Sequence, residues 1–270
     1  MKGLVQIRDL RVEATTDVGR RVEIIKGVSL DIAEGEVLAL IGESGSGKTT
    51  IAMTLLGYTR PGLRISGGEI LLDGVDMVAL SEKKRADIRG AKVAYVPQSA
   101  AAAFNPAMTI MDQVIEVTRI HRLMSSADAR AKAVSLFKTL SLPQPESIGD
   151  RYPHEVSGGQ LQRLAAAMAL IGDPRVVIFD EPTTALDVTT QVEVLRAFKA
   201  VTRKQRVACV YVSHDLAVVA QIADRIVVQG RRGARKRHDP ADSGRAPPSL
   251  HSGITGGFRA EIPRSSAARR

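Results

Sequence analysis

Residues 37–49 read Val37-Leu38-Ala39-Leu40-Ile41-Gly42-Glu43-Ser44-Gly45-Ser46-Gly47-Lys48-Thr49. The first five form a continuous apolar run, which predicts a buried strand. The next eight match the pattern GxxxxGK[ST], and a helical stretch at 49–56 follows them. Glycines at this spacing let backbone N–H groups point at phosphate oxygens. The segment therefore predicts a phosphate-binding loop between a strand and a helix.

The chemistry of this loop assigns a role to each residue type. Lys48 is expected to reach the β- and γ-phosphates of ATP, and the Thr49 hydroxyl to ligate Mg²⁺. The loop alone does not tell one nucleotide hydrolase from another. The predicted nucleotide-binding residues here are Gly42, Glu43, Ser44, Gly45, Ser46, Gly47, Lys48, Thr49 and Thr50.

A second apolar strand, at 175–179, runs into two adjacent acids, Asp180 and Glu181. An acid at the end of a buried strand suits a metal ligand, so Asp180 is expected to hold Mg²⁺ directly or through water. Glu181 is then expected to act as the general base that polarises the attacking water. The alternative, a solvated acidic strand end, is disfavoured by the phosphate loop in the same chain.

The segment Val156-Ser157-Gly158-Gly159-Gln160 lies 17 residues before that strand. A hydroxyl and two glycines at a helix start make another end that can bind phosphate. The same residues would also serve as a plain helix cap, and the pentapeptide alone leaves both interpretations open. With Val156 in place of a leading Leu, it resembles the LSGGQ signature of ABC-type ATPases.

This resemblance covers nearly all of residues 1–230 and implies further site residues. Gln98 is similar to the family's Q-loop glutamine, which touches Mg²⁺ or the water and faces the membrane partner. Residues 182–187 are similar to the D-loop, and His214 to the switch histidine that contacts the γ-phosphate. The implied catalytic residues are Glu181, His214 and Gln98, and the implied Mg²⁺ ligands are Thr49, Gln98 and Asp180.

The family also implies a dimer of ATPase subunits, homo- or heteromeric, with two ATP at the interface. Ser157, Gly158, Gly159 and Gln160 of one subunit would close on the nucleotide held by Lys48 of the other. Within the family, the charged insert at 81–92 and the run Phe104–Ile110 resemble the oligopeptide, dipeptide and nickel importer group.

The expected function is therefore the ATP-hydrolysing subunit of an ABC importer for peptides. Its expected partners are two membrane permease subunits, contacted through residues 98–105, and a solute-binding protein. The rival interpretation is a non-transport ABC ATPase of DNA repair or translation. Such proteins usually carry two cassettes or a long coiled-coil insert, and this chain shows one cassette and no such insert.

The order of strands and helices indicates an α/β fold. We expect a P-loop NTPase core of the ABC ATPase type, an N-terminal antiparallel β-subdomain and an inserted helical subdomain at about 99–165. Residues 1–230 would form this domain. Strands are predicted at 4–7, 22–25, 28–32, 37–41, 66–73, 93–96, 175–179, 207–212 and 226–228, and helices at 49–56, 108–123 and 126–140, the last capped by Ser126.

Composition sets outer limits on these interpretations. The 270 residues are 44% hydrophobic and 25% charged, and the single cysteine, Cys209, excludes a disulfide framework. No run approaches the roughly 18 apolar residues of a membrane span, and the charged N-terminus does not resemble a signal peptide. We expect a peripheral protein on the cytoplasmic face of the cell (inner) membrane.

Residues 231–270 differ from the rest of the chain. Ten basic and three acidic residues there account for seven of the nine net positive charges, so the basic balance does not argue for a nucleic-acid partner. Gly, Pro and Ser make up 14 of these 40 residues. Such composition predicts a tail without stable structure, either native or the product of a frameshift near codon 230, and we favour the frameshift.

The N-terminal region departs from the family at the expected adenine position. Many ABC ATPases stack the base on an aromatic residue, but the first aromatic residue here is Tyr58. Val22, Arg20 or Arg21 is expected to cover the base instead.

Overall fold

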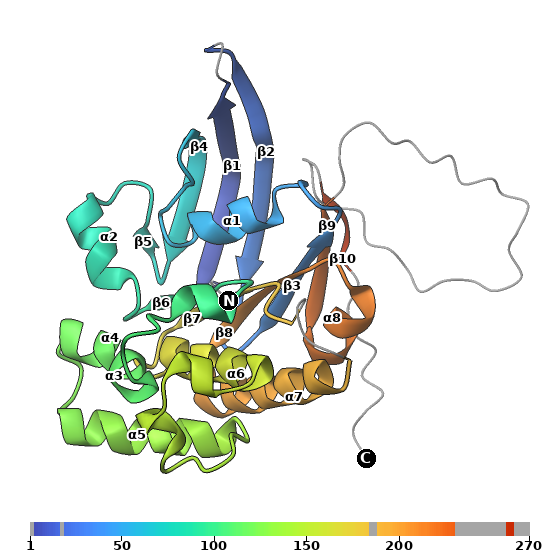
Figure 1. The fold of residues 1–270 in the computed structure, drawn as a ribbon. Helices are drawn as coiled ribbons and strands as arrows, with labels where there is room; N and C mark the ends of the chain where they lie inside the picture. The colour runs from blue at the N-terminus through green and yellow to red at the C-terminus, as the bar shows by residue number, and fades with distance from the viewer. Residues whose placement is uncertain (1–2, 17–18, 184–187, 230–257, 262–270) are drawn as a thin grey trace, which may run out of the picture.

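Two sheets and a group of helices make up the fold (Figure 1). The structure is a computed structural model, and it describes residues 3–16, 19–183, 188–229 and 258–261. The smaller sheet is antiparallel, with the order β2-β1-β4-β5. Its strands are β1 Val5–Thr15, β2 Arg21–Ile32, β4 Leu63–Leu72 and β5 Val75–Asp76.

The larger sheet has the order β10-β9-β3-β8-β7-β6, and its five strands from β9 to β6 run parallel. The strands of this sheet are β3 Val37–Gly42, β6 Val93–Val96, β7 Val176–Asp180, β8 Ala208–Ser213, β9 Arg225–Gln229 and the antiparallel β10 Phe258–Glu261. Both the antiparallel N-terminal sheet and the parallel core sheet match the predicted fold class.

Both faces of the parallel sheet are buried, which explains its continuous apolar strands. In β3, Val37, Ala39 and Ile41 join the core under the helices, while Leu38 and Leu40 point to the other face. That other face packs against the small sheet and against helix α1, Lys48–Thr54. Because both faces are covered, no period-2 alternation is visible in these strands.

Most of the remaining helices pack on the first face or beside it, and α2 lies next to the small sheet (Figure 1). Among the described residues, no helix is both long and apolar enough to cross a membrane. The helices other than α1 are α2 Glu82–Ile88, η1 Ala100–Ala103, α3 Ile110–Val114, α4 Glu116–Ile120, α5 Ser126–Thr139, η2 Ile148–Asp150, η3 Pro153–Glu155, α6 Gly158–Leu170, α7 Val188–Gln205 and α8 Leu216–Ile222.

Three local predictions differ from the structure. The strands predicted at 22–25 and 28–32 are one strand, β2, because Gly27 adopts a φ of 73° and shifts the register instead of turning the chain. The helix predicted at 108–123 is two short helices, and the Thr118 hydroxyl donates to the Ile115 carbonyl where they meet. The cap of α5 is Ser125 rather than Ser126, since its Oγ accepts from the Asp128 N–H.

Most of the predicted structureless tail lies outside the described residues. Its four described residues form β10, which pairs antiparallel with β9, so the prediction of no strand there is wrong at this point. The edge of β9 offers a row of backbone groups, and pairing satisfies them whatever side chains the added strand carries.

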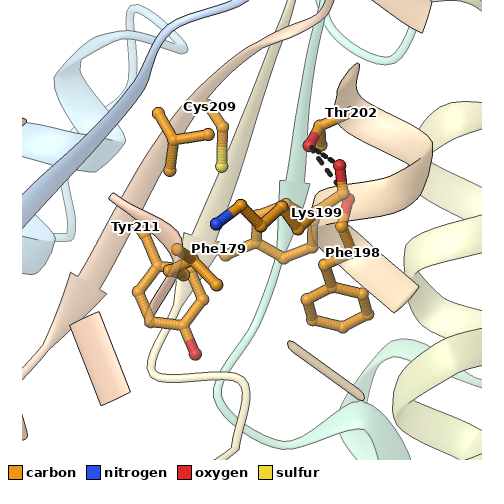
Figure 2. Close-up of a pocket in the computed structure, with 8 residues that line it drawn as sticks. Phe179, Phe198, Lys199, Thr202, Cys209 and Tyr211 are labelled. Atoms are coloured by element: carbon orange, nitrogen blue, oxygen red, sulfur yellow. Dashed lines mark hydrogen bonds between the residues drawn. The ribbon is translucent and has the colours of Figure 1, made fainter. Parts of the chain in front are cut away.

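A small pocket lies between the parallel sheet and helix α7 (Figure 2). Phe179 of β7 stacks on Phe198 of α7 with ring centroids 4.6 Å apart. The ring centroid of Tyr211 of β8 lies 6.2 Å from that of Phe179. The thiol of Cys209 also faces this pocket and is buried, as predicted for an inert core cysteine. These aromatic side chains support the ends of β7 and β8 from below.

Candidate nucleotide-binding site

The predicted site residues gather where the parallel strands end. Gly42 ends β3, Asp180 ends β7 and Ser213 ends β8, and the register sets these strands side by side. The carboxyl ends of parallel strands form the usual ligand-binding edge of such a sheet. The sheet therefore brings together residues as far apart in sequence as Gly42 and Ser213.

The phosphate loop turns directly from β3 into α1. Gly47 has a φ of 95°, and a Cβ at this position would lie 2.5 Å from Ile25 Cδ1. A side chain at residue 47 would therefore be strained and would also clash. This close approach explains the glycine immediately before Lys48.

Lys48 is buried, with 5% of its surface exposed. Its Nζ donates to the Gly42 carbonyl at 2.8 Å and to the Glu43 carbonyl at 2.9 Å. Burial lowers the pKa of Lys48, and the carboxylates of Glu181 and Asp180 oppose that shift. The loop thus holds a poorly solvated cation that anionic phosphate oxygens would stabilise.

Asp180 is buried and accepts a hydrogen bond on each carboxylate oxygen. The Thr49 hydroxyl donates to Oδ1 at 2.9 Å, and the Tyr95 hydroxyl donates to Oδ2 at 2.8 Å. Burial is the main cause of a raised pKa at Tyr95, and the hydrogen bond with Asp180 raises it further, so Tyr95 remains a donor. The oxygen donors of Thr49 and Asp180 fit Mg²⁺, which prefers such ligands.

Glu181 follows Asp180 in a left-handed backbone conformation, with a φ of 47°. Its N–H donates to the Val212 carbonyl at 2.9 Å, which fixes the turn against β8. Its carboxylate contacts Gln98 and His214: Gln98 Nε2 lies 3.2 Å and His214 Nδ1 3.3 Å from Oε2. A left-handed non-glycine residue at this edge is the kind of strain found at functional sites.

Ser46 provides a further sign that the loop is built for a ligand. Its Oγ is buried and finds no hydrogen-bond partner within the part of the chain that the structure describes. Buried hydroxyls are normally paired, and a phosphate oxygen would supply the missing acceptor.

The signature residues are the first turn of α6. Ser157 and Gln160 bond to each other in a capping box, with Gln160 N donating to Ser157 Oγ and Ser157 N to Gln160 Oε1. A Cβ on Gly159 would lie 2.4 Å from Thr190 Cγ2 of α7. Within one chain these residues serve as the helix cap that the sequence left open as an alternative.

Of the D-loop, Thr184–Asp187 lie outside the described residues. Thr183 is buried, and its Oγ1 lies 3.2 Å from the Tyr211 hydroxyl and accepts from Gln191 Nε2 at 3.0 Å. This contact ties the start of the D-loop to β8 and α7.

Three candidate site residues were missed from sequence. Tyr95 carries no motif, and only the pairing of β6 with β7 shows that it reaches Asp180. Gln162 donates to the Gln98 carbonyl, and this contact could not be predicted because 64 residues separate the two in sequence. Ile24 lies 3.9 Å from a Cβ placed on Gly47, beside the exposed Val22 that the sequence suggested for the base.

The comparisons with known proteins agree with this geometry. The family described as ABC transporter matches residues 25–184. The chain belongs to the ABC transporter family. It is 40% identical over 229 residues to the dipeptide transport ATP-binding protein DppD of Bacillus subtilis, covering 84% of this chain and 68% of that protein.

Two further relatives fall in the same group. The oligopeptide transport ATP-binding protein OppD of Bacillus subtilis is 39% identical, covering 83% of this chain and 63% of that protein. The metal-staphylopine import ATP-binding protein CntD of Staphylococcus aureus strain Mu50 is 39% identical, covering 84% of this chain and 83% of that protein. The predicted membership of a peptide importer group within the ABC family is confirmed.

Solved structures support the same fold. A dimeric ATP-binding cassette, MJ0796, in a post-hydrolysis state bound to ADP and Pi superposes with a TM-score of 0.72 at 27% identity. The match covers 83% of this chain and 93% of that one. The predicted fold and the predicted ABC-type ATPase class are confirmed, and the non-transport alternative finds no support among the relatives named here.

Proposed function

We propose that this chain is the ATP-hydrolysing subunit of an ABC import complex for peptides. The observation that carries the proposal is the cluster around Asp180 and Glu181, where Thr49, Gln98 and His214 converge on two adjacent carboxylates. The named relatives are ATP-binding proteins of dipeptide transport, oligopeptide transport and metal-staphylopine import, so peptide-like solutes are the class that fits.

Each cluster residue has a role in hydrolysis. Lys48 binds the β- and γ-phosphates, and Thr49 and Asp180 hold Mg²⁺, with Gln98 as a third ligand. Bound Mg²⁺ neutralises phosphate charge. Glu181 accepts a proton from the attacking water, and His214 contacts the γ-phosphate beside it. The shared contact of Gln98 and His214 with Glu181 Oε2 keeps this carboxylate facing the reaction.

Two chains are needed to complete the site. The cap geometry of Ser157 uses only its own helix, which leaves its outer side for a nucleotide on a second subunit. The dimeric state of the solved relative supports this arrangement. As in the importer group that this chain resembles, two permease subunits would carry out translocation, and a solute-binding protein would deliver the solute. The complex would place this chain at the cytoplasmic face of the inner membrane.

The test uses the full chain alone and with its permeases in vesicles. Wild type is expected to hydrolyse ATP only with Mg²⁺ and to import a labelled dipeptide or oligopeptide. Glu181→Gln fills the same space but cannot accept a proton, so turnover should fall by about 10²–10⁴ while ATP binding persists. Import of a metallophore but not of peptides would revise the solute, and near-normal hydrolysis by Glu181→Gln would remove Glu181 from its role.

A further inference from the structure

Gln162 of α6 makes a contact that joins two motifs. Its Nε2 donates to the main-chain carbonyl of Gln98 at 3.1 Å. Gln98 lies in the short link between the end of β6 and the start of η1, and α6 packs against both of those elements. The contact therefore ties the helix that begins at Ser157 to the loop that carries Gln98.

Burying Gln162 at this position costs folding free energy. It is 3% exposed, and its Oε1 is buried without a hydrogen-bond partner in the described chain. Flipping the amide would not remove the problem, because Oε1 would then face the Gln98 carbonyl and two acceptors would lie against each other. An apolar side chain of the same shape would avoid the unpaired acceptor, so packing alone does not account for Gln162.

The same loop continues the path to the reacting group. Beyond its carbonyl, the Gln98 side chain donates to Glu181 Oε2 at 3.2 Å. Two hydrogen bonds thus run from α6 through Gln98 to Glu181. A shift of α6 relative to the sheet would move the Gln98 backbone and change its contact with that carboxylate.

We propose that Gln162 is a positioning residue that fixes Gln98 against Glu181 according to where α6 lies. The proposal rests on the hydrolytic function proposed above and adds a residue outside the signature itself. Gln162 acts through Gln98 and touches no phosphate. Its loss should therefore lower turnover and leave nucleotide affinity unchanged.

The test is Gln162→Met in the full chain, which keeps the shape and removes the donor. The expected result is ATP affinity within about twofold of wild type and kcat lowered between about two- and tenfold, the range for one hydrogen bond. The melting temperature should not fall, because the unpaired acceptor is also removed. Gln221→Met is the matched control: Gln221 Nε2 donates to the Ala217 carbonyl on α8 at 3.3 Å, far from these motifs in sequence, and its loss should leave kcat unchanged.

A double-mutant cycle separates positioning from general damage. In a Gln98→Ala background, which has no side chain left to position, Gln162→Met should change kcat by less than about a third of its effect in wild type. Additive effects, an unchanged kcat, or an unfolded Gln162→Met variant would each overturn the proposal. A wild-type chain that fails to hydrolyse ATP would instead refute the proposed function.

Discussion

Tyr95 holds the far oxygen of Asp180. Its hydroxyl lies 2.8 Å from Oδ2, opposite the oxygen that the Thr49 hydroxyl contacts. Two donors, one on each oxygen of this buried carboxylate, fix its plane. Asp180 is therefore oriented by a strand neighbour as well as by the phosphate loop.

Tyr95→Phe removes this donor with little change in shape. Hydrogen bonds to charged groups contribute about 1.5–3 kcal/mol, so the Mg²⁺ concentration for half-maximal hydrolysis should rise about tenfold or more. The measurement is a Mg²⁺ titration, paired with Mn²⁺ binding followed by electron paramagnetic resonance in the presence of ADP.

Nucleotide affinity without metal serves as the control for Tyr95→Phe and should not change. Tyr58→Phe offers a matched variant on a tyrosine half exposed at the surface. An unaltered Mg²⁺ titration would show that the Tyr95 hydroxyl does not orient the metal ligand.

The motifs were predictable because their chemistry is local in sequence. A glycine loop between a buried strand and Lys48 needs only a few adjacent residues, and so does an apolar strand ending in Asp180 and Glu181. The resemblance to the ABC family then supplied Gln98 and His214. The structure brings all of these residues to one edge of the sheet.

The contacts of Tyr95 and Gln162 were not predictable in the same way. Tyr95 reaches Asp180 because β6 pairs with β7 in a register that sets Tyr95 opposite Ile178. Neither strand order nor register can be read from continuous apolar runs, which look alike in every buried strand. The single long strand β2 was missed for a related reason, since Gly27 looks like a turn but makes a bulge.

Lys48→Ala should abolish ATP binding at micromolar nucleotide. The phosphates lose the buried cation that their charge would stabilise, and no solvent replaces it fully. Equilibrium binding of labelled ATP decides the question. Lys92→Ala, at an exposed lysine in the same chain, should bind as wild type. Unchanged affinity in Lys48→Ala would mean that this loop is not the phosphate site.

Cys209 should resist alkylation even at alkaline pH. Burial is the main cause of the raised pKa of its thiol, and the charge of Asp224 raises it further. An unfolded thiol ionises near pH 8.5, so above that pH the unfolded chain loses a proton that the folded chain keeps, and the contribution to folding stability falls as pH rises.

The measurement for Cys209 is the rate of iodoacetamide labelling at pH 9, with and without denaturant. Labelling through global unfolding alone should be at least about a thousandfold slower in the folded chain. Cys209→Ala supplies the background. Fast labelling of the folded chain would show that the pocket beneath Phe179 opens to solvent.

Ser157→Arg should stop hydrolysis while leaving ATP binding to the monomer intact. A bulky cation at the start of α6 would block closure of a second subunit, and Lys48 lies elsewhere in its own chain's site. The change also removes a helix cap, at a cost of about 1 kcal/mol in the free energy of unfolding.

Ser125→Arg is the matched control, because Ser125 caps α5 through the same kind of bond to the Asp128 N–H and lies outside the signature. Both variants should lose similar stability, but only Ser157→Arg should lose turnover and the ATP-dependent dimer seen by size-exclusion chromatography. If ATP binding falls as far as hydrolysis in Ser157→Arg, the signature acts within its own chain and the shared site between two subunits is wrong.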